Sequence, residues 1–315
     1  MNFFRAVLAD GNKRLLRFRA HGFRFRHHDR QLLRAARSRQ SQFVPTAALG
    51  LLLGGATLTA HGVAAHNPNH QARILGEGPR TVILESGLGD TLDVWKDIQP
   101  RIAAGCARTL AYTRAGYIGS DPPTGPRDAA TVVAELRSEL RRRNLHPPYV
   151  LVGHSLGGLY MQYFARNYPS EVVGLVLVDS THWNQRMALQ AAFANRPYKR
   201  RGEVTLFMPW VMRREFLDSV PAGEQVHNSP PVQFVPTIVL SSTTAPNGET
   251  PSARATAARL QDEIVADFPG AQHIRVEGAG HYIQRDRPDV VVGAARQLAG
   301  CPAEDGAQRI ETISR

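Results

Sequence analysis

Residues 153–158 read Gly-His-Ser-Leu-Gly-Gly, and they join two segments of different character. The apolar run 148–152 before them predicts a buried strand, and residues 159–165 after them predict a helix. A serine on a tight turn between a strand and a helix projects its hydroxyl above the sheet, where it can act as a nucleophile. The N-terminal N–H groups of the helix would favour negative charge there. Ser155 is therefore our candidate nucleophile.

Strand and helix patterns alternate from about residue 71, which predicts an α/β protein with a mostly parallel central sheet and helices on both faces. The run 172–178 is almost entirely β-branched or apolar, as in a strand covered on both sides. The expected strands cover 81–86, 109–113, 148–152, 172–178, 237–240 and 274–276. The expected helices cover 94–104, 131–142, 159–165, 253–268 and 288–298.

Residues 181–235 interrupt this alternation and are rich in large apolar side chains. Such a segment can be a helical excursion with a small core of its own. It can also be a cap whose apolar side shapes a substrate pocket, and one segment can serve both purposes. We expect a helical cap over 181–235, within a main domain that covers 71–300 and is followed by a C-terminal tail, 301–315.

The net charge of +11 is concentrated at the N-terminus. Residues 1–40 contain eleven Lys or Arg and two Asp, so the other 275 residues carry a net charge of only +2. A basic tail on a nearly neutral body does not describe a nucleic-acid-binding domain. We expect residues 1–42 to form a disordered cytoplasmic tail, and we expect no nucleic-acid partner.

Residues 43–60 carry no charge over a length that just reaches across a bilayer. We interpret 43–65 as a signal anchor or as the core of a signal peptide, with small residues near 63–65 where a peptidase could cut. The arginines on the N-terminal side would keep the tail inside. The main domain would then be held at the membrane by 43–60, outside the cytoplasm, or secreted. The alternative is a buried N-terminal helix in a cytoplasmic protein.

The two cysteines, Cys106 and Cys301, permit one disulfide at most. Nothing in the sequence brings them together, so we expect two buried free thiols. The histidines and cysteines form no cluster with metal-ligand spacing, and we predict neither a metal nor a cofactor.

A serine nucleophile needs a base, and His281 is our candidate. It lies on the glycine-rich loop 278–282 after the last expected strand, from which its ring could reach over the sheet edge. It is also the last histidine in the chain, which suits the order serine, acid, histidine. His154, beside the serine, is expected to be structural.

The reaction also needs N–H donors for the oxyanion. The backbone N–H of Leu156, directly after the serine, is expected to be one of them. The other is expected from the loop 86–89 after the first strong strand. We assign it to Leu88, because the preceding glycine lets the backbone turn inward.

A carboxylate is needed to hold the base, and two candidates remain open. Asp179 ends the strand that follows the nucleophile's own strand. Glu249 is the first carboxylate after the strand 237–240. We favour Asp179 and keep Glu249 as the alternative acid.

Together these motifs resemble the α/β-hydrolase superfamily over roughly 71–300, and most closely its branch of serine hydrolases. The matching stretches are ESGLG at 85–89, YTRAGY at 112–117, GHSLGG at 153–158, LVDS at 177–180 and GAGH at 278–281. The resemblance implies an eight-stranded sheet, a cap after strand six and a Ser-His-acid triad. This chain has Thr113 where the family usually has aspartate, and the region before Thr81 is short for the usual opening hairpin.

The resulting hypothesis is a cofactor-free carboxylesterase- or lipase-like hydrolase of a small acyl substrate with an apolar part. One variant is a lipase whose basic tail binds anionic lipid. Alternatives on the same scaffold are a non-catalytic binding protein and a cofactor-free haloperoxidase or lyase.

Overall fold

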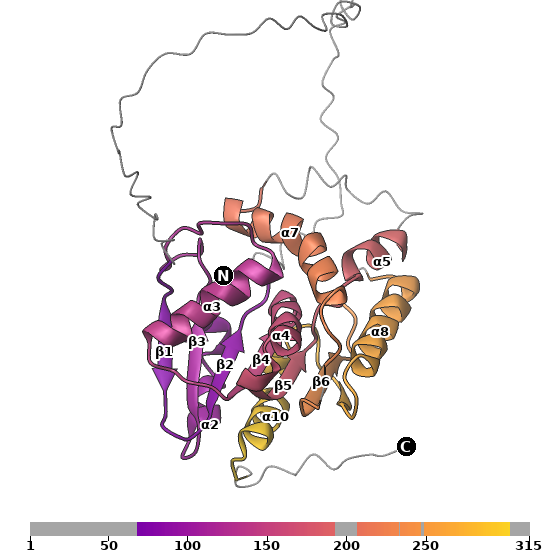
Figure 1. Cartoon of the computed structure of the whole chain (residues 1–315). Coiled ribbons are helices and arrows are strands. Elements are labelled where there is room, and N and C mark those ends of the chain that lie inside the picture. Colours follow the sequence, from indigo (N-terminus) through magenta and orange to yellow (C-terminus); the bar gives the residue numbers. More distant parts are fainter. Residues whose placement is uncertain (1–67, 193–206, 233, 247–248, 303–315) are drawn as a thin grey trace, which may run out of the picture. The chain divides into compact units, whose positions relative to one another are not determined.

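A seven-stranded sheet runs through the part of the chain described by this computed structural model, residues 68–192, 207–232, 234–246 and 249–302 (Figure 1). Its order is β1-β3-β2-β4-β5-β6-β7. Only β1 is antiparallel to its neighbour, so the predicted mostly parallel sheet is confirmed. The strands are β1 (Ala72–Leu75), β2 (Thr81–Glu85), β3 (Arg108–Tyr112), β4 (Tyr149–His154), β5 (Val172–Val178), β6 (Thr237–Ser242) and β7 (Gln272–Val276).

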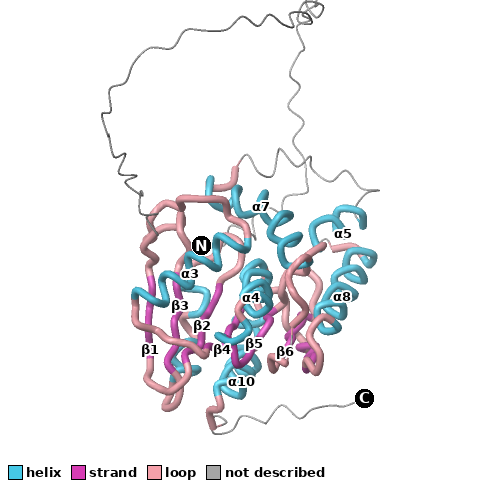
Figure 2. The backbone as a smooth tube through the Cα atoms, in the orientation of Figure 1, coloured by secondary structure: helices cyan, strands magenta, loops and turns pink. Residues whose placement is uncertain are grey.

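Helices cover both faces of the sheet, as Figure 2 shows. The helix expected over 94–104 is divided into two, because Pro100 has no N–H to donate to a carbonyl of the preceding turn and is tolerated only in the first turn of a helix, here that of α2. The helices are η1 (Leu92–Trp95), α2 (Gln99–Ala103), α3 (Ala129–Arg142), α4 (Leu156–Asn167), η2 (Pro169–Glu171), α5 (Gln185–Ala192), α7 (Trp210–His227), α8 (Pro251–Ala266), α9 (Ile283–Asp286) and α10 (Pro288–Ala299).

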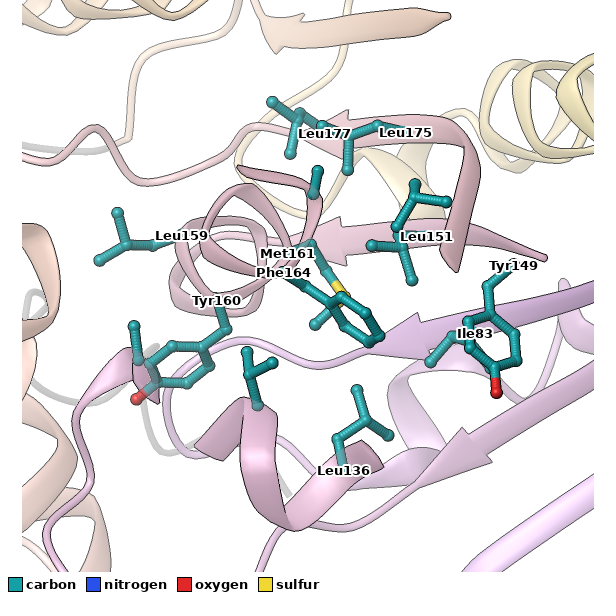
Figure 3. Close-up of a cluster of buried hydrophobic side chains, with 14 of the residues drawn as sticks. Ile83, Leu136, Tyr149, Leu151, Leu159, Tyr160, Met161, Phe164, Leu175 and Leu177 are labelled. Carbon is teal, nitrogen blue, oxygen red and sulfur yellow. The ribbon is translucent and has the colours of Figure 1, made fainter. Parts of the chain in front are cut away.

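The strands separate two hydrophobic clusters, because successive side chains point to opposite faces. On one face Ile83, Leu151 and Leu175 pack against α3, α4 and the end of α8 (Figure 3). On the other, Val82, Val150 and their neighbours pack against η1, α2 and α10. Both sides of the central strands are therefore buried, which explains their nearly continuous apolar sequences.

The first strand differs from what the resemblance implies. Within the described residues the sheet has seven strands rather than eight, and β1 is a single four-residue strand paired with β3. Only residues 76–80 separate β1 from β2, so the two are joined by a short turn in which Gly76 has φ of 72°. The short sequence before Thr81 already indicates such a reduction.

The insertion between β5 and β6 contains two described helices, α5 and α7. Gly223 of α7 lies so close to Trp183 that a Cβ added there would be 2.1 Å from the Trp183 carbonyl oxygen. The Trp183 ring stacks on His227 with 4.0 Å between centroids. Residues 185–192 and 210–227 of the segment are thus helical, as predicted, 193–206 and residue 233 lie outside the description, and the assignment of 181–235 as a cap stays a prediction.

The predicted tail, 1–42, and the predicted anchor or signal core, 43–65, also lie outside the described residues, as does 303–315. Within the described ranges, none of the helices combines the length and the apolar character that a bilayer span requires.

Cys106 and Cys301 form a disulfide, so the prediction of two free thiols is wrong. Their Cα atoms are 5.7 Å apart although 195 positions separate them in the sequence. The pairing depends on how α10 packs against α2: Arg296 Nη1 of α10 donates hydrogen bonds to the carbonyls of Arg101 and Ala104 at the end of α2. No local pattern encodes that contact.

We expect the double variant Cys106→Ser, Cys301→Ser to be less stable than the oxidised protein. In the chain-entropy model, a cross-link across so long a loop contributes on the order of 3–5 kcal/mol to the free energy of unfolding. Urea titration of both proteins measures the difference. A thiol count of the denatured, unreduced protein is the control, and two free thiols per chain would contradict the disulfide.

Candidate active site

Ser155 lies at the sharp turn between β4 and α4 with a backbone conformation that side chains rarely adopt, φ 52° and ψ −122°. Its N–H donates to the Val178 carbonyl at 3.1 Å, and its own carbonyl accepts from Thr181 and Gly158 at 2.9 Å each. Strain of this kind costs of order 1–3 kcal/mol and persists only where the surroundings hold it. Backbone bonds to the neighbouring strand β5 and its loop therefore hold the turn.

The glycines beside Ser155 let backbone segments approach the turn. A Cβ added at Gly153 would lie 2.7 Å from the Cα of Gly158, inside the turn itself. A Cβ added at Gly157 would lie 2.4 Å from the carbonyl oxygen of Ser86. Real Cβ contacts are not this short, so both positions require glycine. As a result the loop after β2 lies directly against the first turn of α4.

His281 joins Ser155 to Asp179. Its Nε2 is 3.0 Å from Ser155 Oγ, and its Nδ1 is 2.7 Å from Asp179 Oδ2. The loop after β7 that carries it turns at Gly278, where φ is 73°, and is held where the Gly280 N–H donates to Asp286 Oδ2 of α9 at 2.8 Å. The structure thus brings together three residues that lie at the carboxyl ends of β4, β5 and β7.

Asp179 is held as firmly as the serine. It too has a positive φ, 41°, and its N–H donates to the Leu240 carbonyl at 2.7 Å. Its Oδ1 accepts from the Ser242 N–H at 3.0 Å, which leaves Oδ2 for His281. Burial acts to raise the pKa of Asp179, but the hydrogen bond and positive charge of His281 outweigh it and the pKa is lowered. The carboxylate is therefore ionised at neutral pH.

The pKa of His281 shifts in the opposite direction. Loss of hydration around the ring acts to lower its pKa, although 43 % of the side chain is exposed. The hydrogen bond and charge of Asp179 outweigh this effect and raise the pKa above the usual value.

Glu249, the alternative acid, lies near Arg254 instead. Its carboxylate lies 4.0 Å from the Arg254 guanidinium, and burial raises its pKa. Asp179 is the carboxylate that contacts the ring.

His154 supports the loop that carries His281. It is fully buried, and its Nε2 lies 2.9 Å from the His281 carbonyl oxygen, to which it donates. Burial, with the nearby charge of His281, lowers the pKa of His154 to about 3, so the ring is neutral at physiological pH. Its role in the described structure is that of a backbone support.

The two backbone N–H groups that the sequence predicts as oxyanion donors belong to segments that contact each other. Leu156 is the first residue of α4, where a helix leaves N–H groups without an internal partner. Leu88 lies in the loop after β2, between Gly87 and Gly89. The contact of this loop with Gly157 brings the backbone of 86–89 to the N-terminus of α4. The sequence had placed one oxyanion donor on each side of this contact.

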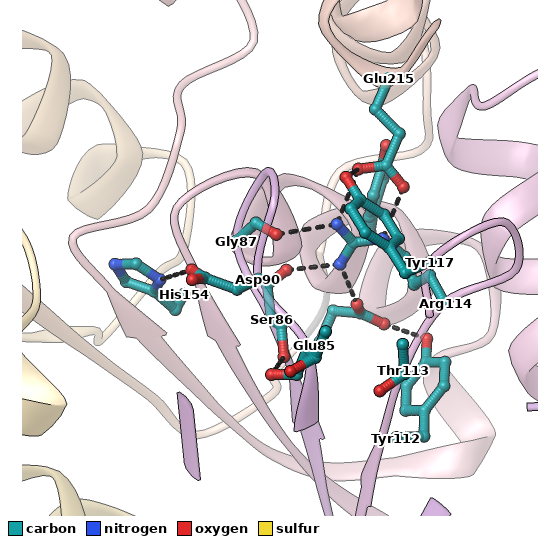
Figure 4. Close-up of polar contacts among 12 residues, drawn as sticks. Glu85, Ser86, Gly87, Asp90, Tyr112, Thr113, Arg114, Tyr117, His154 and Glu215 are labelled. Atoms are coloured by element: carbon teal, nitrogen blue, oxygen red, sulfur yellow. Dashed lines mark hydrogen bonds and ion pairs between the residues drawn. The ribbon is translucent and has the colours of Figure 1, made fainter. Parts of the chain in front are cut away.

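A buried polar network, which the sequence did not predict, lies beside that loop (Figure 4). Arg114, only 1 % exposed, forms ion pairs with Glu85 and with Glu215 of α7, and all three are buried. Tyr112 also donates to Glu85. Glu215 follows Val211 by four residues on the buried stripe of α7, and a charged residue on an apolar stripe was the available signal.

Thr113, where the resembling family has aspartate, makes a local contact of its own. It is fully buried, and its Oγ1 accepts from the Leu92 N–H at 3.1 Å. The hydroxyl thereby fixes the start of η1. Among the described residues, no group of three or more His, Cys, Asp or Glu is arranged to hold a metal ion.

A family model described as "Alpha/beta hydrolase family" matches residues 82–295. Among curated proteins, the chain is similar to the uncharacterized proteins YqjL and YbdG of Bacillus subtilis. It is 30% identical to YqjL over 123 residues, 39% of this chain and 47% of that protein. It is 36% identical to YbdG over 106 residues, 33% and 32% of the two chains. The matches thus span less than half the length of these relatives.

Two solved structures share the fold. One is a hydrolase from Pseudomonas aeruginosa PA01, with a TM-score of 0.54 and 20% identity over 75% of this chain and 100% of that one. The other is an esterase, EaEST, from Exiguobacterium antarcticum, with a TM-score of 0.53 and 14% identity over 74% and 96%. At these identities the likeness concerns the fold alone.

The contact between His281 and Asp179 predicts how the ring titrates. We expect an NMR titration to give His281 a pKa above the usual 6.5, because the carboxylate stabilises the charged ring. In Asp179→Asn that pKa should fall, because the loss of hydration that lowers it remains and the negative charge that raised it is gone. Glu249→Gln is the matched control and should leave the His281 titration where it is. An equal fall in both variants would contradict the geometry.

Proposed function

Because the chain belongs to the alpha/beta hydrolase family, we propose that it is a serine hydrolase that cleaves an ester or related acyl compound with an apolar part. The carrying observation is the continuous chain of contacts from Ser155 Oγ through His281 to Asp179, at 3.0 and 2.7 Å. Such a chain is the arrangement that activates a hydroxyl for attack on a carbonyl. The family hosts several chemistries, so the reaction is argued from this site.

The first half-reaction forms an acyl-enzyme. Ser155 Oγ attacks the carbonyl carbon while His281 Nε2 accepts its proton, and the carbonyl electrons move to the oxygen. The charged ring is stabilised by ionised Asp179, which also holds Nδ1 protonated and Nε2 free to accept. When the tetrahedral intermediate collapses, His281 returns the proton to the leaving alcohol. Water then repeats the sequence on the acyl-enzyme and releases the acid.

The oxyanion would be held by the N–H groups of Leu88 and Leu156. Both donors belong to backbone that the turn and its glycines keep in place, so little reorganisation is needed as charge develops. The dipole of α4, whose N-terminus begins at Leu156, adds to the stabilisation.

The apolar part of the substrate would be accommodated under the inserted segment. Met212 of α7 lies against the loop after β2, with its Cε 3.1 Å from a Cβ added at Gly89. Trp183, at the start of the insertion, is partly buried against the core. We therefore propose that 181–235 forms a cap whose apolar side chains contact the acyl or alcohol group.

The disulfide supports a location outside the cytoplasm. Structural disulfides persist in oxidising compartments and are rare in the cytosol, so Cys106–Cys301 fits a secreted or surface-exposed hydrolase. An anchor formed by 43–60 remains part of this proposal and lies outside the described residues.

We expect a fluorophosphonate probe to label the wild-type protein and to leave Ser155→Ala unlabelled, because the probe bonds to an activated serine oxygen. Mass spectrometry of the labelled peptide identifies the residue. A folded wild-type sample that neither reacts nor releases p-nitrophenol from short esters would favour the non-catalytic binding protein.

We expect Asp179→Asn to lower kcat by about 10⁴-fold, as loss of the orienting carboxylate does in such triads. Glu249→Gln should stay within about threefold of wild type, since Glu249 makes no contact with the ring in the described structure. Steady-state kinetics with p-nitrophenyl esters of rising chain length measure both. The reverse ranking would make Glu249 the acid.

The pH profile follows from His281. The neutral ring is the base, so kcat/KM should rise with pH as His281 loses its proton, with a midpoint above 6.5 because its pKa is raised. A rate that is flat from pH 5 to 9 would argue against imidazole catalysis.

A further inference from the structure

The loop that carries Leu88 is held on both sides by two buried side chains. Arg114 donates from Nη1 to the Ser86 carbonyl at 2.5 Å and from Nη2 to the Gly87 carbonyl at 2.8 Å. On the other side, the Gly89 N–H donates to the Tyr117 hydroxyl at 3.0 Å. The peptide units before and after Leu88 are therefore fixed, while Leu88 itself lies between them.

Both of these side chains donate hydrogen bonds to one carboxylate, that of Glu215. Arg114 Nε and Nη2 donate to its two oxygens at 2.7 Å each, and the Tyr117 hydroxyl donates to Oε2 at 2.7 Å (Figure 4). A carboxylate in an ion pair can only accept hydrogen bonds, so the Tyr117 hydroxyl is the donor in its hydrogen bond with Glu215. The lone pairs of the Tyr117 oxygen are then free to receive the Gly89 N–H.

All five N–H donors of the Arg114 guanidinium are engaged in hydrogen bonds. Of its five N–H donors, two go to Glu215, one to Glu85, one to Ser86 and one to Gly87. The side chain is 1 % exposed, so water cannot replace a lost partner. Any rotation would break several bonds at once. Both Glu85 and Glu215 form ion pairs with this guanidinium, and the two oxygens of Glu215, each accepting one N–H, also fix its orientation.

We propose that Glu215 is a positioning residue for the oxyanion hole. Through Arg114 and Tyr117 it holds the Leu88 N–H where the oxyanion of the intermediate develops, and this inference rests on the proposed function. Glu215 does not touch the substrate.

The position of Glu215 on α7 makes the inserted helix part of the catalytic geometry. Val211, one turn earlier, packs on the same region, with its Cγ2 2.6 Å from a Cβ added at Gly116. Met212 lies on Gly89. Helix α7 therefore supplies both the Glu215 carboxylate and side chains that pack on the loop, so the position of the proposed oxyanion donor depends on how this helix packs.

Glu215→Gln tests the proposal at nearly constant volume. The new NH₂ group cannot accept, so it opposes either Arg114 or the Tyr117 hydroxyl and releases one side of the loop. With p-nitrophenyl acetate, and with active sites counted by fluorophosphonate labelling, we expect kcat to fall about 10- to 100-fold. KM should change less than about threefold, since substrate binding is not touched. Affinity for a trifluoromethyl ketone, whose adduct with Ser155 carries the oxyanion, should fall by the same factor as kcat/KM.

Glu139→Gln is the matched control. It removes another buried carboxylate, which pairs with Arg142 and Arg143, and in the described structure these three residues contact neither Glu215 nor the loop 86–89. It should lower the urea midpoint as Glu215→Gln does and leave kcat per active site unchanged.

Tyr117→Phe removes only the two hydrogen bonds of the Tyr117 hydroxyl, one from the Gly89 N–H and one to Glu215. We expect a smaller fall in kcat, about three- to tenfold, with the same unchanged KM.

Two results would overturn the inference. One is kcat per active site within twofold of wild type in Glu215→Gln. The other is a loss of ketone affinity no greater than in Glu139→Gln. If Glu215→Gln does not fold, Tyr117→Phe decides, and wild-type kcat there rejects the proposal. A wild-type protein without esterase turnover would instead refute the proposed function, and this inference with it, so the two failures are distinguishable.

Discussion

The turn at Ser155 is the constraint on which the rest of the site depends. A non-glycine residue at φ 52° is stable only if its neighbours hold it, and here they are the carbonyl of Val178, the Thr181 N–H and the backbone beside Gly157. The same contacts bring β5 and the loop after β2 to the serine. Asp179 and the Leu88 loop are therefore positioned by the interactions that stabilise the turn.

The parallel sheet brings together site residues that are far apart in the sequence. In parallel strands the carboxyl ends meet at one edge, and β2, β4, β5, β6 and β7 are adjacent there. Loops that follow these strands carry Leu88, Ser155, Asp179 and His281. Asp179 is held from the next strand, where the Ser242 N–H donates to its Oδ1. Site geometry in this chain is thus a consequence of strand register.

Much of this arrangement could be predicted from local patterns. The run around 153–158 encodes a strand, a turn and a helix within a few residues, and all three are present at that place. The alternating elements from residue 71 likewise gave a mostly parallel sheet. Local patterns failed where a contact spans the fold: α10 brings Cys301 to Cys106 across 195 positions, and Arg114 meets Glu215 across 101.

Sequence alone determined the fold class, the strained serine and the loop histidine, because each depends on residues that are neighbours along the chain. Only the tertiary structure decided that Asp179 rather than Glu249 contacts the ring, that the cysteines pair, and that a carboxylate from the insertion binds the arginine that holds the Leu88 loop. Those outcomes depend on which helices and strands pack together, and packing is a property of the whole buried core rather than of any segment.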